Sequence, residues 1–223
     1  NKHIIPDITL FINGIPVWVV ECKSPKIAEP MEEAITQLKR YQNDRWAENN
    51  EWSEKLFYFN QFIIASTRQE ARVWTIKANT EHFLEWKDSY PIKTSDIHTE
   101  ADSETITSQQ VLIEWMLNKV NLLDIISNFI VFKTDDKWRK IKILCRYQQF
   151  RAVNKAIAKL SNPSLSQNDK WGIIWHTQGS GKSLTMIFLI RKFRKTEEWR
   201  KYKIIFLTDR TDLQRQIWET AKT

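Results

Sequence analysis

The chain has 223 residues, enough for one large domain or two small ones, and its formal net charge is +7. No apolar run reaches the roughly 18 residues of a membrane span, and no basic-then-apolar leader opens the chain. The only two cysteines, Cys22 and Cys145, do not have metal-ligand spacing. We therefore expect a protein of the reducing cytoplasm without a membrane partner.

Charge is divided unevenly along the chain. Residues 1–132 contain 13 Lys/Arg and 19 Asp/Glu, a net charge of −6, whereas residues 133–223 contain 21 and 8, a net charge of +13. A basic half indicates nucleic acid as a partner. A solvated basic face without a partner, or a surface for an acidic domain, would give the same composition.

Two apolar runs near the start, residues 4–12 and 15–23, flank Asn13-Gly14, the strongest short signal for a β-hairpin. Charged residues stand where the hairpin opens, namely Asp7, Glu21 and Lys23. Two carboxylates can hold a divalent cation that activates water, and a lysine can position that water or stabilise the attacked phosphorus. The alternative is a hairpin that ends in solvated charges.

The register of this hairpin matters for a shared metal site. A two-residue turn at Asn13-Gly14 pairs residues whose numbers sum to 27, which would place Asp7 opposite Val20 and turn Glu21 to the other face. A metal site needs an even sum. We therefore predict a three-residue loop, residues 12–14, with Gly14 in the left-handed region as part of a bulge.

Residues 29–47 are predicted to form a helix, because apolar residues recur at helical spacing at Met31, Ile35 and Leu38. Gln37 and Tyr41 are neighbours on an adjacent face. Strands are predicted at 56–66 and 71–76, so that the first unit is a small mixed sheet. The polar stretch 88–108 is predicted to contain a linker.

The second half begins with two predicted short helices, at residues 110–117 and 121–129. A charged connection (133–142), a helix (143–160) and a loop (161–170) follow. An apolar strand (172–175), a Gly/Ser loop and a helix (184–193) follow in the order of a phosphate-binding loop. The loop reads His176-Thr177-Gln178-Gly179-Ser180-Gly181-Lys182-Ser183 and contains two of the four glycines. Its first residue departs from the strict pattern, which has glycine there.

Phosphate loops bind nucleotides through backbone N–H groups, the N-terminus of a helix and a lysine. Here Lys182 would reach the β- and γ-phosphates, and Ser183 would bind the Mg²⁺ of the nucleotide. A further buried strand is predicted at 203–208. Strand, helix and strand predict a parallel sheet, with Thr208, Asp209 and Arg210 at its ligand-binding edge.

These motifs resemble, in their order, the motor and endonuclease subunit of type I restriction enzymes, in which a PD-(D/E)xK nuclease precedes a superfamily 2 helicase core. The residues of the resemblance are Asp7, Glu21-x-Lys23, Gln37-x-x-x-Tyr41, Arg146-x-x-Gln149, His176 to Ser183 and Thr208-Asp209-Arg210. His176 also matches that family's form of the loop. The resemblance covers nearly the whole chain.

The resemblance implies an α/β protein with an N-terminally truncated endonuclease domain at 1–95, a linker at 96–108 and a partial RecA-like ATPase domain at 109–223. It implies that Mg²⁺ is bound by Asp7, Glu21 and the backbone carbonyl of Cys22. The implied catalytic residues are Asp7, Glu21, Lys23, Gln37 and Tyr41.

For the nucleotide, the resemblance implies ATP. The implied ATP-binding residues are Arg146, Gln149, Thr177, Gln178, Gly179, Ser180, Gly181, Lys182 and Ser183. Gln149 would read the adenine, with Gln148 as the rival if the register differs by one. Thr208, Asp209 and Arg210 would contact DNA or couple it to ATP.

The implied activity is that of an ATP-dependent type I site-specific deoxyribonuclease, which cuts double-stranded DNA nonspecifically after translocating it. Its partners would be the modification and specificity subunits in a bacterial or archaeal cytoplasm. We expect the chain to be a fragment that is incomplete for ATP hydrolysis. The alternatives are a repair or anti-phage nuclease–helicase outside the type I system, and a non-enzymatic nucleotide-binding assembly module.

Overall fold

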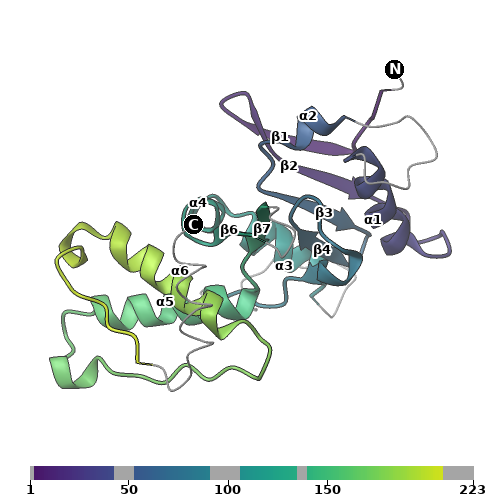
Figure 1. The fold of residues 1–223 in the computed structure, drawn as a ribbon. Helices are drawn as coiled ribbons and strands as arrows, with labels where there is room; N and C mark the ends of the chain where they lie inside the picture. Colours follow the sequence, from purple (N-terminus) through teal and green to yellow (C-terminus); the bar gives the residue numbers. More distant parts are fainter. Residues whose placement is uncertain (1–2, 43–52, 91–105, 135–139, 208–223) are drawn as a thin grey trace. The chain divides into compact units, whose positions relative to one another are not determined.

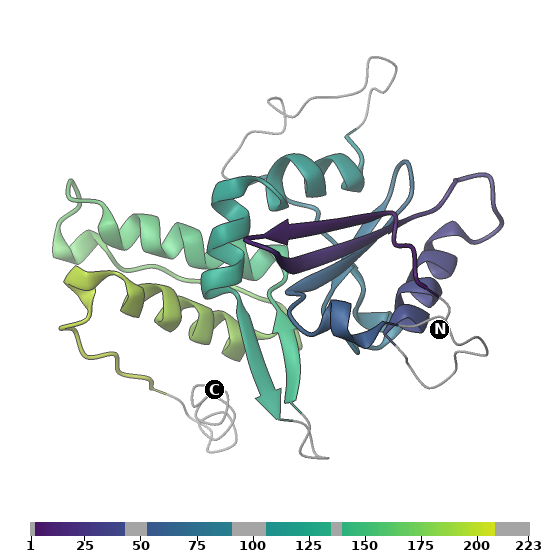
Figure 2. The ribbon, with the colours of Figure 1, turned by 90° about the horizontal axis from the view of Figure 1, so that it is seen from above.

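The computed structural model describes residues 3–42, 53–90, 106–134 and 140–207, which belong to the two compact units Asn1–Leu122 and Leu123–Thr223 (Figures 1 and 2). The first unit contains a five-stranded mixed sheet in the order β1-β2-β3-β4-β5, in which only β2 and β3 are parallel. The predicted mixed sheet is therefore confirmed. Among these residues, no helix has the length and apolar character to cross a membrane.

The strands of the first unit are β1 (Ile8–Ile12), β2 (Ile15–Cys22), β3 (Phe62–Ser66), β4 (Ala71–Trp74) and β5 (Leu84–Glu85). The helices are α1 (Pro30–Tyr41), α2 (Glu54–Phe57), a 3-10 turn (Thr80–His82), α3 (Ser108–Val111) and a π-helical turn (Leu112–Met116). Helix α4 (Lys119–Asn128) leads into the second unit. The strand predicted at 56–66 is thus wrong in its first part, where α2 ends in a turn.

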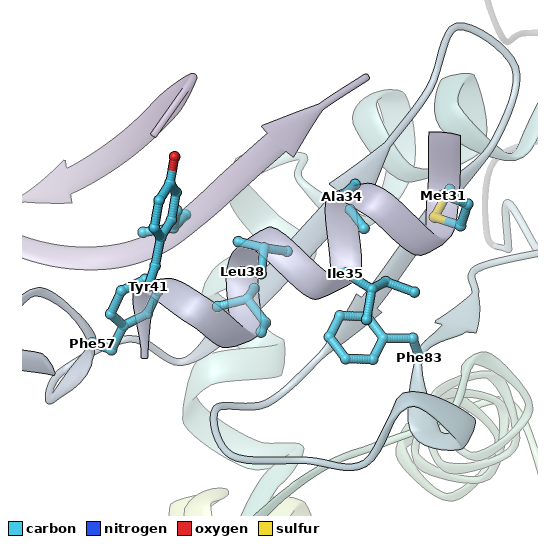
Figure 3. Close-up of a cluster of buried hydrophobic side chains, with 10 residues drawn as sticks. Met31, Ala34, Ile35, Leu38, Tyr41, Phe57 and Phe83 are labelled. Carbon is cyan, nitrogen blue, oxygen red and sulfur yellow. The ribbon is translucent and has the colours of Figure 1, made fainter. Parts of the chain in front are cut away.

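Helix α1 supplies one side of the core of the first unit. Proline at its first turn, acidic residues in that turn and basic residues in the last turn all favour a helix here. Its apolar stripe packs against Val19 of β2 and against Ile63 and Ala65 of β3. The buried residues of this stripe, drawn in Figure 3, are Met31, Ala34, Ile35, Leu38 and Tyr41.

Leu38 lies at the centre of this stripe and is 0% exposed. Replacing Leu38 by alanine should lower the free energy of unfolding of the first unit by about 2–5 kcal/mol, because the change removes buried methyl groups and leaves a cavity. Urea unfolding measures the loss. The control is Ile113→Ala, at an apolar residue of the same unit that is 52% exposed; a similar small effect in both variants would contradict the prediction.

The hairpin turn differs from the prediction. Asn13 and Gly14 both have positive φ, 51° and 79°, and Ile12 pairs with Ile15. The loop therefore has two residues rather than the predicted three. Asparagine and glycine are the residues that tolerate a left-handed conformation at both central positions, so this pair favours the shorter turn.

The even register is nevertheless present, because a bulge lies further along the hairpin. Phe11 pairs with Pro16, but Leu10 pairs with Trp18, so the register shifts by one residue within β2. Beyond this bulge the paired numbers sum to 28, as in Ile8 with Val20. The prediction of an even register is confirmed, although the turn does not produce it.

The helix after the predicted linker belongs to the first unit. The Ser108 hydroxyl accepts a hydrogen bond from the Ala71 backbone N–H (3.1 Å), and the Gln109 amide donates to the Ser66 hydroxyl (3.0 Å). The compact units divide after Leu122, whereas the predicted second domain starts at 109. A polar stretch marks a connection, but it does not tell which unit the next helix packs against.

The second unit contains a two-stranded antiparallel hairpin and two long helices that lie side by side in Figures 1 and 2. Its elements are β6 (Ile130–Thr134), β7 (Lys140–Leu144), α5 (Tyr147–Ser161), a 3-10 turn (Gln167–Asp169), α6 (Lys182–Lys195) and a 3-10 turn (Glu197–Trp199). The ring centres of Phe150 and Phe188 lie 4.6 and 5.5 Å from the ring centre of Phe129, and these three rings form the core of the second unit. The connection predicted at 133–142 is wrong at both ends, which are strands.

The predicted parallel sheet is not shown by the described residues. The segments 172–175 and 203–207 have no assigned secondary structure, and their apolar side chains are exposed, with Ile173 at 84% and Leu207 at 93%. A strand requires a neighbouring strand to supply hydrogen-bond partners. The local apolar pattern predicts that the segment is buried, but it does not predict which strand would pair with it.

Candidate functional site

The predicted nuclease residues meet where β2 ends. Glu21 and Lys23 follow Val19 at alternate positions, so they lie on the sheet face that α1 covers. Asp7 precedes Ile8, whose partner in the sheet is Val20, and this register places Asp7 opposite Glu21. The Asp7 carboxylate Oδ2 accepts a hydrogen bond of 2.7 Å from the Cys22 backbone N–H.

A chain of hydrogen bonds holds Lys23 in place. Its Nζ donates to Glu21 Oε1 (2.8 Å) and to Gln37 Oε1 (2.5 Å). The Gln37 amide Nε2 donates to the Tyr41 hydroxyl (2.5 Å), which in turn donates to the Ile5 carbonyl (3.2 Å). Residues of one helix therefore orient Lys23 and also anchor the segment that leads to Asp7.

Glu21 is the most unusual group of this site. It is 1% exposed, and its Oε2 atom is buried without a hydrogen-bond partner among the described residues. Burial raises the pKa of the Glu21 carboxyl; the hydrogen bond and charge of Lys23 act in the opposite direction, and the Asp7 charge adds to the rise. A buried acceptor without a partner is costly, and such a group calls for a ligand or another functional reason.

The carboxylates of Asp7 and Glu21 fit a magnesium ion. Mg²⁺ is usually bound by one or two carboxylates, with waters and substrate phosphates completing its shell. The buried Glu21 Oε2 offers an acceptor that no group of the described residues uses. Among the described residues, no group of three or more His, Cys, Asp or Glu could form an all-protein cage. The role of the Cys22 carbonyl as a metal ligand stays a prediction. The pKa of the Cys22 thiol is raised, and partial burial of this group is the largest cause.

The phosphate loop adopts the conformation that its glycines allow. Gly179 and Gly181 have φ of 75° and 82°, and α6 begins at Lys182 directly after them. The Thr177 carbonyl accepts hydrogen bonds from the Ser180 hydroxyl (2.6 Å) and from Lys182 Nζ (3.1 Å). The predicted succession of loop and helix is confirmed, and the first turn of α6 offers its N–H groups to an anion.

Gln149 supports this loop from α5. The side chain is 2% exposed, and its Nε2 donates to the carbonyls of Gly181 (3.1 Å) and Ser180 (3.3 Å). Its Oε1 accepts from the Arg146 backbone N–H (2.9 Å). Gln148, the rival position, is exposed. The structure thus brings Gln149 to the loop through contacts that the sequence did not predict, and adenine reading stays a prediction.

The remaining predicted residues are placed as follows. Thr177, Gln178 and the Arg146 side chain are exposed, and Ser183 is half-buried in the first turn of α6. Thr208, Asp209 and Arg210 lie outside the described residues. His176 has a buried Nε2 without a hydrogen-bond partner within the described part of the chain.

Sequence reasoning missed the anchor of the phosphate-loop helix. Lys192 Nζ donates to Asp124 Oδ2 and Asn154 Oδ1, both at 2.5 Å, and Arg191 donates to the Ile130 carbonyl. These contacts tie α6 to α4, α5 and β6. Lysines and arginines in the last turn of a helix interact favourably with the helix dipole, and the sequence pattern indicates that much. It does not predict hydrogen-bond partners that lie about 40 to 70 residues away in sequence.

Two protein families match successive parts of the chain. Residues 1–82 match the family model of the type I restriction enzyme R protein N terminus, and residues 148–223 match that of the SWI2/SNF2 ATPase. The chain is thus a nuclease-type sheet domain followed by the beginning of an ATPase-type part. More particularly, it belongs to the family of type I restriction enzyme R proteins.

Two similar proteins show the extent of this relation. The chain is 33% identical over 218 residues to the HindI endonuclease subunit of Haemophilus influenzae. These residues make up 97% of the chain and 19% of that protein. The chain is 27% identical over 216 residues to the SauCOLORF180P endonuclease subunit of Staphylococcus aureus, which covers 96% of the chain and 20% of that protein. The chain therefore spans about a fifth of the length of these relatives.

Proposed function

We propose that the chain contributes the nuclease domain and the beginning of the ATPase domain to a type I restriction enzyme. Its nuclease site would cut double-stranded DNA nonspecifically with Mg²⁺, and its phosphate loop would bind ATP for DNA translocation. The observation that carries the proposal is the site of Asp7, Glu21 and Lys23, in which one buried carboxylate oxygen has no described partner. The relatives named above favour this function over a repair or anti-phage nuclease–helicase outside the type I system.

Asp7 and Glu21 would hold the metal ion. When bound, Mg²⁺ lowers the pKa of a water and neutralises charge on the attacked phosphate. Glu21 Oε1 is engaged with Lys23 and Asp7 Oδ2 with the Cys22 N–H, so Glu21 Oε2 is the carboxylate oxygen best suited to the ion.

Lys23 would act as a cation and a donor rather than as a base. Its Nζ already donates to two oxygens, on Glu21 and Gln37, and an ammonium group has three N–H donors. The third can reach the attacking water or a phosphate oxygen. During hydrolysis the water oxygen forms a bond to phosphorus and its proton passes to solvent, while the ester bond to the leaving sugar oxygen breaks and that oxygen takes a proton from solvent. The fixed positive charge of Lys23 stabilises the charge that develops.

In the ATPase part, we propose that the N–H groups at the start of α6 and the Lys182 ammonium bind the nucleotide phosphates. Lys182 Nζ would leave the Thr177 carbonyl when phosphate is present, because a charged acceptor is the stronger partner. We further propose that segments 172–175 and 203–208 are the first strands of a RecA-like parallel sheet. Binding of the modification and specificity subunits belongs to the same proposal.

Metal binding tests the nuclease site. We expect one Mn²⁺ ion per chain in isothermal titration, and an anomalous peak roughly 2.0–2.5 Å from oxygens of Asp7 and Glu21 in a Mn²⁺-soaked crystal. Glu21→Gln should abolish this binding, since it removes the charge of the buried carboxylate. Glu33→Gln, at an exposed position of α1, should leave it unchanged.

Retention of Mn²⁺ binding by the Glu21→Gln variant would overturn the proposed metal site. A crystal peak elsewhere in the chain would do the same. Circular dichroism of both variants shows whether the fold is kept, and a folded Glu21→Gln protein without metal binding is the result that supports the site.

A further inference from the structure

The β6–β7 hairpin is half anchored and half exposed. At its base, Ile130, Val131 and Leu144 are buried, and the Arg191 guanidinium of α6 donates to the Ile130 carbonyl. Towards the turn, Phe132 is 44% exposed and Ile141 is 39% exposed. In Figure 2 the two strands extend away from helices α5 and α6 of the same unit. The outer half is therefore a two-stranded ribbon that no described element of its unit covers.

The charge of this ribbon is of one sign. The two strands contain three lysines and no aspartate or glutamate, in the sequences Ile130–Thr134 and Lys140–Leu144. Lys133 and Lys140 are exposed, and neither forms an ion pair with a described residue. Two exposed cations beside exposed apolar side chains form a surface suited to a polyanion.

The pairing register places these groups on defined faces. Lys142 lies opposite Phe132, and Lys140 lies opposite Thr134, so all four side chains share one face. The Lys142 ammonium stands 5.6 Å from the centre of the Phe132 ring. Lys133, opposite Ile141, occupies the other face. The ribbon thus presents cations on both faces, and a hydroxyl on one.

We propose that the outer half of the β6–β7 hairpin, formed by Phe132, Lys133, Thr134, Lys140 and Ile141, is a contact surface for the backbone of duplex DNA. A two-stranded ribbon has the width of the major groove of B-form DNA, and lysines on its two faces can then meet the phosphates on either side. The identity of the polyanion as duplex DNA rests on the proposed function. The surface itself is independent of the nuclease residues and of the phosphate loop.

The surface would also link DNA to the nucleotide site. Arg191 and Lys192 belong to α6, whose first residues form the end of the phosphate loop. They hold the Ile130 carbonyl and Asp124, next to the base of the ribbon. DNA held by the ribbon would therefore be joined to the nucleotide-binding helix through direct hydrogen bonds within one unit.

The test is duplex binding by the chain and by a Lys133→Ala/Lys140→Ala variant. Fluorescence anisotropy with a labelled 30-base-pair duplex, repeated at several KCl concentrations, gives the dissociation constant and its salt dependence. We expect the double variant to bind roughly tenfold more weakly, and the slope of log affinity against log salt to fall by about 2, because two phosphate contacts are lost. Two duplexes of different sequence should show the same loss.

The matched control is Lys159→Ala/Lys201→Ala, which removes the same charge from exposed lysines of the same unit. This control variant should keep most of the duplex affinity, and the slope of log affinity against log salt should stay unchanged. Equal losses in both double variants, no loss in the first, or no duplex binding by the unchanged chain would overturn the proposal. A greater loss for single-stranded than for duplex DNA would overturn the assignment to duplex.

Thermal melting by circular dichroism verifies that the Lys133→Ala/Lys140→Ala variant is folded, and Lys133→Gln/Lys140→Gln serves as a second variant that keeps more of each side chain. Mn²⁺ titration of the same proteins separates this proposal from the nuclease site. Normal metal binding with lost duplex binding in the double variant supports both proposals. Absent metal binding in the unchanged chain, together with duplex binding that the double variant loses, would count against the nuclease site alone.

Discussion

Replacing Lys23 by alanine should reduce DNA cleavage by about 10²–10³-fold, the range expected when one positioned donor to the developing charge is removed. The physical reason is that Lys23 Nζ is held by two acceptors, Glu21 Oε1 and Gln37 Oε1, which leaves one N–H for the reacting groups. The measurement is the rate at which circular plasmid DNA becomes linear in a restriction complex whose endonuclease subunit contains this chain. ATP hydrolysis by the same complex should be unaffected.

The control is Lys26→Ala, which removes an exposed lysine three residues further on. Because Lys23→Ala also leaves the buried Glu21 carboxylate without its cation, some stability should be lost. Lys23→Arg keeps a cation for Glu21, but its planar guanidinium cannot reproduce the two hydrogen bonds of an ammonium. Rapid cleavage by a folded Lys23→Arg protein and by Lys23→Ala would show that Lys23 has only a structural role.

The hairpin shows how far the sequence alone determines the site. Asn13-Gly14 predicted the turn, and the need for one shared face predicted an even register, as observed. The place of the bulge within β2 was not predicted, although Pro16 stands beside it and proline inside a sheet is typical of edge strands and bulges. Bulges depend on how a strand is bent by its neighbours, and here β2 is paired on both sides.

The helix α1 was predicted well for a different reason. Its apolar stripe has helical spacing, and the same spacing brings Gln37 and Tyr41 to one side. Their partners were beyond reach of sequence reasoning, since the Ile5 carbonyl is 36 residues away from Tyr41. The motif therefore predicted which residues matter, and only the structure showed that they join Lys23 to the segment before Asp7.

The second unit was predicted less well. Lysines at alternate positions in Lys140–Leu144 were taken for a charged connection, although a strand with one polar face has the same period of two. Strands are predicted at 172–175 and 203–208, but no described strand pairs with the described residues of these runs, 172–175 and 203–207. Local pattern describes how a segment can be buried, whereas sheet formation depends on a neighbour distant in sequence.

The second large effect is expected at Gly181, where we predict that alanine will weaken ATP binding roughly ten- to a hundredfold. The backbone φ is +82°, and a Cβ at this position would lie 2.6 Å from Gln149 Nε2. Holding a non-glycine residue in this region costs about 1–3 kcal/mol, and the displaced Gln149 would release the Ser180 and Gly181 carbonyls. Titration of the chain with a fluorescent ATP analogue measures the effect.

A matched control is Gly172→Ala, because an added Cβ there meets nothing within 4 Å and the φ is not positive. A Gly181→Ala/Gln149→Ala variant should bind ATP no more tightly than Gly181→Ala alone, because the strained φ persists and the hydrogen bonds that hold the Ser180 and Gly181 carbonyls are still lost. Unchanged ATP affinity in Gly181→Ala would show that the loop geometry of this structure is not the one that holds the nucleotide.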